Sequence, residues 1–128
     1  MAEVPADATI TFLPCSDLGA SREFYEAVLG LQLVADQGTC LIFKASADGF
    51  VGVCTRANPD PGDGIIVTLV ADDVDRWCNE IVHRGGVLAS GPEHSDSYPI
   101  YHAFIADPDG NLVEIQRFDD PDWATAAI

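Results

Sequence analysis

The sequence has few basic side chains. It contains six Lys and Arg residues against 21 Asp and Glu residues, which gives a formal net charge of −15 at pH 7. Nucleic acids and anionic membranes attract proteins that present a positive face. The composition therefore argues against nucleic-acid and membrane partners, and the acidic field favours a neutral or cationic small molecule.

The sequence also lacks long apolar runs and paired-cysteine motifs. No stretch approaches the roughly 20 apolar residues of a membrane span, and the N-terminal residues 1–5 do not have the charged-then-apolar pattern of a signal peptide. Cys15, Cys40, Cys54 and Cys78 have no CxxC spacing. We therefore predict a cytoplasmic protein with reduced cysteines, in which Cys15, next to a predicted turn, is the candidate for a reactive thiol.

An internal repeat is present in this chain. In each copy an apolar strand-like run is followed by an Asp, an amphipathic helix, a glycine and further apolar runs. A shift of the sequence by 56 positions matches Ile10 with Ile66, Leu13 with Leu69, Asp17 with Asp73 and Gly30 with Gly86. The repeat predicts an α+β fold of two βαβββ modules within a single domain of residues 1–128.

The boundaries follow from turn residues and hydrophobic periodicity. We expect the first module at about 8–56, a linker rich in Pro and Gly at 57–64, the second module at about 65–118 and a tail at 119–128. Each helix is expected to begin at an Asp cap, Asp17 or Asp72/Asp73, and to end at glycine. The predicted strands are 9–14, 32–35, 39–45, 51–56, 65–70, 87–89, 101–106 and 112–118, and the segment 90–100, with two prolines, is expected to be an irregular loop and a candidate lid.

Two motifs carry a family resemblance. Residues 17–30 read DLGASREFYEAVLG and residues 107–115 read DPDGNLVEI. They are similar to the first-helix signature and the terminal hairpin of the glyoxalase/bleomycin-resistance/extradiol-dioxygenase superfamily, also called the vicinal oxygen chelate fold. The resemblance covers roughly residues 9–118. It implies that the paired modules form an incomplete barrel around a cleft, and that the protein is a homodimer.

Metal-using members of that family hold an ion with His or Glu at four strand positions that face the cleft. Two of these positions lie seven residues before the capping Asp17 and Asp73, at Ile10 and Ile66. The other two lie four residues after the hairpin glycines 49 and 110, at Val53 and Glu114. Three are aliphatic, whereas a transition-metal site needs about three N, O or S ligands. We therefore expect no metal, and the absence of a nucleotide or phosphate-loop motif predicts no other cofactor.

Glu114 is the first candidate for chemistry, either as a general base or as the group that binds a ligand's cation or amide. On the preceding strand, Tyr101 and His102 alternate, so at most one of them lines the cleft with Glu114. In the predicted loop, Glu93, His94 and Asp96 are an alternative source of metal ligands beside Glu114. The residues expected to line an apolar, ligand-binding cleft are Ile10, Phe12, Val53, Ile66 and Thr68, unless they simply fill the barrel.

Two functions are consistent with this pattern. The first is a binding protein that resembles the antibiotic-sequestering members of the family and holds an aromatic or cationic molecule without a metal. The second is an enzyme of glyoxalase type, a lyase, isomerase or dioxygenase, in which Glu114 and either His102 or Tyr101 perform acid–base chemistry.

Overall fold

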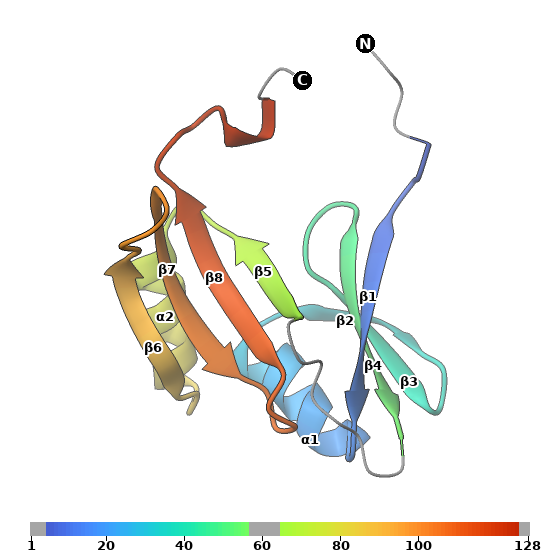
Figure 1. Ribbon diagram of the computed structural model, residues 1–128. Coiled ribbons are helices and arrows are strands. Elements are labelled where there is room, and N and C mark those ends of the chain that lie inside the picture. Colours follow the sequence, from blue (N-terminus) through green and yellow to red (C-terminus); the bar gives the residue numbers. More distant parts are fainter. Residues whose placement is uncertain (1–4, 57–64, 126–128) are drawn as a thin grey trace. The chain divides into compact units, whose positions relative to one another are not determined.

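The computed structural model describes residues 5–56 and 65–125, so the predicted linker at 57–64 lies outside the described residues. Contacts divide the chain into two compact units. One comprises Met1–Ile65 with Asp107–Asn111, and the other comprises Ile66–Ala106 with Leu112–Ile128. Each unit contains one four-stranded mixed sheet, whose strands are labelled in Figure 1. The strand–helix–three-strand order occurs twice, and the predicted α+β class is confirmed.

The first sheet has the order β1-β4-β3-β2. Strand β1 runs parallel to β4, and the β4–β3 and β3–β2 pairs are antiparallel. The bounds of its strands are Thr9–Cys15 for β1, Gln32–Asp36 for β2, Cys40–Lys44 for β3 and Gly49–Thr55 for β4. All four lie where alternating apolar residues predict them, within two residues at each end.

The first helix begins at its predicted cap. Asp17 Oδ1 accepts hydrogen bonds from the backbone N–H groups of Gly19 (2.9 Å) and Ala20 (3.2 Å). Helix α1 (Leu18–Arg22) continues directly into a π-helical segment, η1 (Glu23–Val28), where Leu29 N donates to Phe24 O. Gly30 follows with φ +82°, a left-handed conformation that favours glycine and ends the helix as predicted.

One face of the first sheet forms a core with this helix, which contacts β3 and β4. The Tyr25 ring stacks on Phe43 with centroids 5.5 Å apart. Burial raises the pKa of Tyr25 far above its ordinary value. The buried side chains of this face and of the helix are Leu13, Cys15, Ser21, Phe24, Tyr25, Leu29, Leu41, Phe43, Val51 and Val53.

The DPDGN turn, Asp107–Asn111, belongs by its contacts to the first unit. Asp107 is buried, and its Oδ2 accepts a hydrogen bond from the hydroxyl of Tyr25 at 2.9 Å. Asp109 Oδ1 accepts from both N and Oγ of Ser16, the residue before the helix cap. The two sequence motifs are therefore joined in one hydrogen-bond network.

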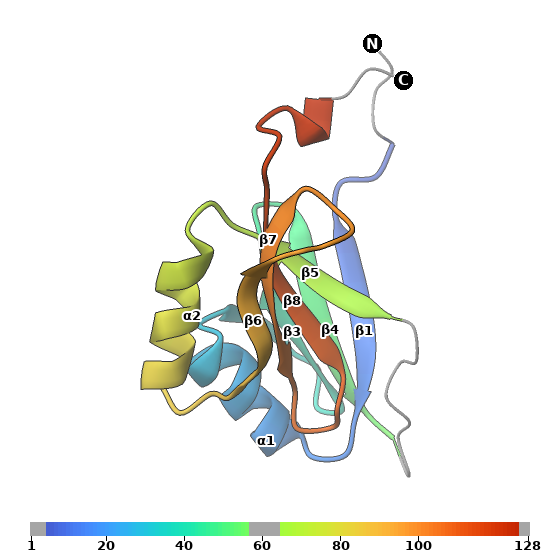
Figure 2. The ribbon, with the colours of Figure 1, turned by 60° about the vertical axis from the view of Figure 1, so that its left-hand side comes forward.

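The second sheet has the order β5-β8-β7-β6, with β5 parallel to β8 and the other pairs antiparallel. Its strands are β5 (Ile66–Val70), β6 (Leu88–His94), β7 (Ile100–Ala106) and β8 (Leu112–Phe118). Helix α2 (Val74–His83) packs on β6, β7 and β8, and Figure 2 shows it alongside β6. Asp73 caps α2, because its side chain accepts a hydrogen bond from Arg76 N. It is one of the two predicted cap residues, Asp72 and Asp73.

Strand β6 corrects the prediction of an irregular loop at 90–100. It extends to His94 despite Pro92, through an irregular stretch that contains a cis Gly91–Pro92 bond. The reason is its position, because β6 is an edge strand and pairs with β7 alone. An edge strand tolerates a proline that a central strand would exclude.

A disulfide between Cys40 and Cys54 corrects the prediction of four reduced cysteines. The register of the β3–β4 hairpin places these residues directly opposite each other, with Cα atoms 4.2 Å apart. The prediction of Cys15 as a reactive thiol is also wrong, since Cys15 is completely buried. Desolvation raises the pKa of its thiol, which disfavours the reactive thiolate.

None of the helices in the described ranges is both long enough and apolar enough to cross a membrane.

Candidate functional site

A buried carboxylate lies on the face of the second sheet opposite α2. The register places Glu114 of β8 between Thr68 of β5 and Phe104 of β7, and it places His102 beside Gln116. Side chains of opposed residues share a face and alternate along each strand. We call this surface the Glu114 face; its members are Ile66, Thr68, Val70, His102, Phe104, Leu112, Glu114 and Gln116.

Three side chains hold the Glu114 carboxylate. Thr68 Oγ1 donates to Oε1 at 2.8 Å, and His102 Nδ1 lies 2.5 Å from Oε2. The Gln116 amide is oriented so that both its oxygen and its nitrogen have suitable hydrogen-bond partners. In this orientation Nε2 donates to Oε2 of Glu114 at 2.9 Å and to Oε1 at 3.2 Å. Glu114 is only 8% exposed, and a buried carboxylate is tolerated when its oxygens are hydrogen-bonded in this way.

The contact with Glu114 determines what His102 offers to a ligand. Because an ionised carboxylate only accepts hydrogen bonds, Nδ1 of His102 is the donor in its contact with Oε2 of Glu114. The ring also meets Phe104 edge-on, with centroids 5.1 Å apart. Nε2 makes no hydrogen bond with any residue that the structure describes, so it is the atom through which this pair can bind or accept a proton.

Tyr101 lies on the other face of the sheet, as alternation requires. Its hydroxyl donates to Asp75 Oδ1 of α2, and this hydrogen bond is the main reason that the pKa of Tyr101 is raised. The Arg117 guanidinium lies over the ring at 4.9 Å, and the His94 ring lies at the same centroid distance. Tyr101 therefore belongs to the surface that packs on α2, and the structure does not bring it to Glu114.

The predicted lining residues divide between the two units. Ile66 and Thr68 lie on the Glu114 face, where Ile66 is 46% exposed. Ile10 and Phe12 lie in the first unit, on the face of the first sheet opposite its helix, and Phe12 is 49% exposed. We call this second surface the Phe12 face; its members are Ile10, Phe12, Cys40, Ile42, Lys44, Phe50, Gly52 and Cys54.

Val53 is not on the Phe12 face, and its prediction as a lining residue is wrong. It pairs with Leu13 and Leu41, two core residues, and its exposure is 0%. Gly52 occupies the predicted position instead, opposite Phe12 in β1. A shift of one residue in a strand moves a side chain to the other face. The residue on the same face as Phe12 is therefore three positions after Gly49, not four.

Phe12 lies directly over Gly52, and this contact gives a testable expectation. A Cβ atom at Gly52 would lie 2.4 Å from Cδ1 and 2.5 Å from Cε1 of the Phe12 ring. We expect Gly52→Ala to lower the free energy of unfolding by about 1 kcal/mol, because the exposed ring must turn away. In a Phe12→Ala background the same change should have no such effect, which a double-mutant cycle by urea denaturation measures. Equal losses in both backgrounds would show that the ring does not matter.

The residues present do not fit the metal site that the resemblance implies. Ile10 and Ile66 have no ligand atom, and the hydrogen bonds from Thr68, His102 and Gln116 engage both oxygens of Glu114. The alternative ligands also separate, since Glu93 pairs with His102 while His94 pairs with Tyr101 on the other face. Within the described part of the chain, no three His, Cys, Asp or Glu residues are grouped to hold an ion.

Sequence reasoning missed Gln116 and Phe104 as members of the site. Both could have been found from the two-residue period of a strand. Gln116 is two positions after Glu114, and Phe104 is two positions after His102. Alternation alone could not show that His102, and not Tyr101, is the partner of Glu114. That choice depends on how β7 is aligned with β8.

The fold and the motifs now define the class of protein: an α+β chain of two βαβββ repeats with a terminal DPDGN turn. The family model for the Glyoxalase/Bleomycin resistance protein/Dioxygenase superfamily matches residues 8–115. The chain belongs to this superfamily.

The proteins that are similar to this chain carry names that point to different functions. The chain is 29% identical to virulence protein STM3117 of Salmonella typhimurium, over 83% of this chain and 80% of that protein. It is 26% identical to a probable lactoylglutathione lyase of Vibrio cholerae, over 82% and 86%. The crystal structure of TnmS3, an antibiotic-binding protein from Streptomyces sp. CB03234, matches with a TM-score of 0.74 and 24% identity, over 91% of this chain and 98% of that one.

Proposed function

We propose that this protein binds a small organic molecule at the Glu114 face without converting it, and that His102 Nε2 is its polar anchor. The observation that carries the proposal is the way in which Glu114 is used. Its two oxygens are engaged by Thr68, His102 and Gln116, so the carboxylate orients His102 and does not itself contact the ligand. The role first predicted for Glu114 therefore passes to His102.

The surroundings of His102 favour an apolar ligand that carries one hydrogen-bond donor. Ile66, Val70 and Leu112 are exposed on the Glu114 face, and the Phe104 ring adjoins His102. Ligand sites commonly combine apolar walls with a few fixed polar groups. A hydroxyl or a protonated amine can donate to Nε2, and the net charge of −15 favours a neutral or cationic molecule. TnmS3, which has the same fold, is described as an antibiotic-binding protein, and this supports a small-molecule ligand.

A second candidate is an enzyme in which His102 acts as a general base. A histidine whose Nδ1 is held by a carboxylate is a common arrangement for proton abstraction at Nε2, and a relative is named as a probable lyase. However, Tyr101, the other predicted proton-transfer group, is on the opposite face and bonded to Asp75. Binding is therefore the first proposal.

The test begins with a thermal-shift screen of phenolic and amine-containing aromatic compounds, since a ligand selective for the folded state raises the melting temperature. Affinity for a hit is then measured by calorimetry in the wild type and in His102→Asn. Asparagine retains a donor toward Glu114 but has no atom at the Nε2 position. We expect the affinity to fall about tenfold, the effect of one lost hydrogen bond.

His94→Asn is the matched control, because His94 lies on the neighbouring strand with its ring beside Tyr101. Its affinity for the hit should equal that of the wild type. Unchanged affinity in His102→Asn would overturn the proposed anchor. Mass spectrometry of the ligand after incubation separates the two candidates: a product that forms with the wild type and not with His102→Asn would establish the enzyme and overturn simple binding.

A further inference from the structure

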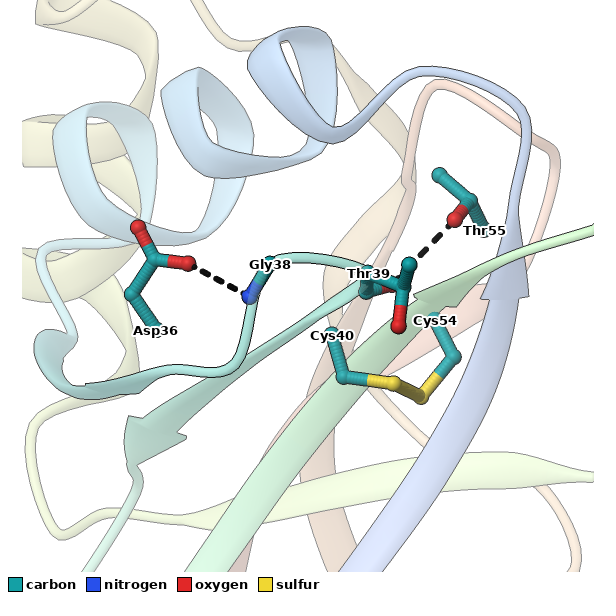
Figure 3. Close-up of a disulfide and its surroundings, with 6 residues drawn as sticks. All are labelled: Asp36, Gly38, Thr39, Cys40, Cys54 and Thr55. Carbon is teal, nitrogen blue, oxygen red and sulfur yellow. Dashed lines mark hydrogen bonds between the residues drawn. A yellow bond between two sulfur atoms is a disulfide. The ribbon is translucent and has the colours of Figure 1, made fainter.

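The Cys40–Cys54 disulfide belongs to the first unit, and its cysteines are not members of the Glu114 face of the second unit. It joins the first residue of β3 to β4 on the Phe12 face, and Figure 3 shows it with the adjacent turn. Both cysteines are partly exposed. A disulfide at a partly exposed position can be reached by an external thiolate, whereas one in a core cannot.

The backbone around this disulfide is held by hydrogen bonds that do not depend on it. On one side, the β3–β4 ladder continues through the pairs Leu41–Val53 and Ile42–Gly52. On the other side, Thr39 O accepts from Thr55 N at 3.0 Å and from Thr55 Oγ1 at 3.2 Å (Figure 3). Opening the S–S bond therefore leaves the two strands paired and the two sulfur atoms opposite each other.

The turn between β2 and β3 is fixed in the same way. Gly38 N donates to Asp36 Oδ1 at 3.0 Å, and Gln37 N donates to Cys40 O at 2.8 Å. Gly38 has φ +85°, which suits the turn. The position of Cys40 is thus set by its neighbours in the backbone, and two thiols held opposite each other re-form a disulfide readily because their effective concentration is high.

The other two cysteines cannot compete in such an exchange. Cys15 and Cys78 are buried thiols, with 0% and 2% exposure. Desolvation raises the pKa of both thiols, so little thiolate is present to attack a disulfide. Thiol chemistry in the folded protein is therefore confined to Cys40 and Cys54.

We propose that Cys40 and Cys54 are a reversible thiol–disulfide site whose reducing substrate is a dithiol. A thiolate of the dithiol attacks one sulfur, forms a mixed disulfide and releases the other cysteine as a thiolate, which takes up a proton. The second thiol of the reductant then loses its proton and attacks the reductant's own sulfur atom in the mixed disulfide. This releases the second cysteine as a thiolate, which also takes up a proton. Two electrons and two protons pass to the protein, and the reductant leaves as a cyclic disulfide.

The form of the pair then depends on the redox conditions around the protein. In a reducing compartment the pair is in the dithiol form, and the disulfide is the form present under oxidising conditions. The exchange needs no ligand at the Glu114 face, so it is independent of the proposed function and is tested separately.

The experiment treats the native, full-length protein with dithiothreitol at pH 8 without denaturant, followed by alkylation and peptide mapping by mass spectrometry. We expect alkylation of Cys40 and Cys54 with Cys15 and Cys78 unmodified, and an unchanged circular dichroism spectrum. In a second reduced sample, from which dithiothreitol is removed and which is not alkylated, oxidised glutathione should restore the Cys40–Cys54 linkage, with two molecules of glutathione released per disulfide formed.

Two results would overturn the proposal. The first is reduction that proceeds only as fast as global unfolding, measured in parallel by urea-jump kinetics, which would make the disulfide a structural crosslink. The second is reoxidation that yields linkages to Cys15 or Cys78. The double variant Cys40→Ser/Cys54→Ser provides an independent measurement: it should keep the native spectrum and consume no dithiothreitol, and loss of the native spectrum would contradict the claim that the strands stay paired.

Discussion

Replacement of Asp107 by Ala is expected to lower the free energy of unfolding by about 3–5 kcal/mol, the range for loss of a buried hydrogen-bond network. The carboxylate accepts four hydrogen bonds. Oδ2 accepts from Tyr25 Oη and Asn111 Nδ2, both at 2.9 Å, while Oδ1 accepts from the backbone N–H groups of Asp109 (2.9 Å) and Asn111 (2.8 Å). Alanine would leave these donors facing a cavity.

The burial of the donors makes this loss large. Tyr25 is 0% exposed and stacks on Phe43, so its hydroxyl cannot turn to water. Urea denaturation followed by circular dichroism measures the effect. Tyr25→Phe removes one donor and leaves Asp107 three bonds, so its loss should be smaller, about 1–2 kcal/mol.

Asp96→Ala is the control, since Asp96 is exposed and its side chain makes no hydrogen bond with the described residues. It should change the free energy of unfolding by less than about 0.5 kcal/mol. If Asp107→Ala were no worse than this control, the DPDGN turn would be a simple hairpin connection with no anchoring role.

The same network shows what local sequence patterns can and cannot predict. The capping role of Asp17, the end of the helix at Gly30 and the turn at Asp107–Asn111 all depend on residues close in the chain, and each was predictable from side-chain chemistry. The bond from Tyr25 to Asp107 spans 82 positions. It depends on packing, which no local pattern contains, and so the two motifs could be recognised while their contact could not.

The candidate site was predictable as far as strand alternation reaches. The two-residue period put Thr68 on one face with Ile66, and it separated Tyr101 from His102. The period cannot set the alignment between strands, and this alignment decides that Glu114 meets His102 and that Val53 turns into the core. The predicted position of Val53 was therefore wrong, although its strand was correctly located.

Two further misses have the same physical origin. Pro92 predicted a loop because proline cannot donate to a central ladder, but β6 proved to be an edge strand, and position in a sheet is not a local property. Cys40 and Cys54 have no motif spacing, yet the hairpin pair Lys44–Phe50 fixes the pairing of every residue outward from it, including these two. The cysteine pair therefore follows from the register of the hairpin, which the separate predictions of strands 39–45 and 51–56 did not include.

Gly91→Ala is expected to lower the free energy of unfolding by about 3 kcal/mol or more, because two effects act together. Gly91 has φ +77°, a conformation that L-residues with a Cβ adopt at a cost. A Cβ at this position would also lie 2.4 Å from the backbone oxygen of His102 and 2.9 Å from Cα of Ala103. Both obstacles are main-chain atoms of β7, so the neighbouring strand itself must move.

Gly38→Ala separates the two effects. Gly38 has φ +85°, and a Cβ there would meet nothing within 4 Å, so its expected loss of about 1 kcal/mol reports the backbone conformation alone. The excess in Gly91→Ala measures the close approach of β6 to β7. The clash involves the backbone of His102, so the folded fraction of Gly91→Ala should bind the ligand more weakly. The affinity of Gly38→Ala should stay unchanged. Calorimetry below the melting temperature measures both affinities. Equal unfolding free energies for the two variants would mean that β6 can withdraw from β7 at no cost, and the Glu114–His102 pair would then not depend on the edge strand.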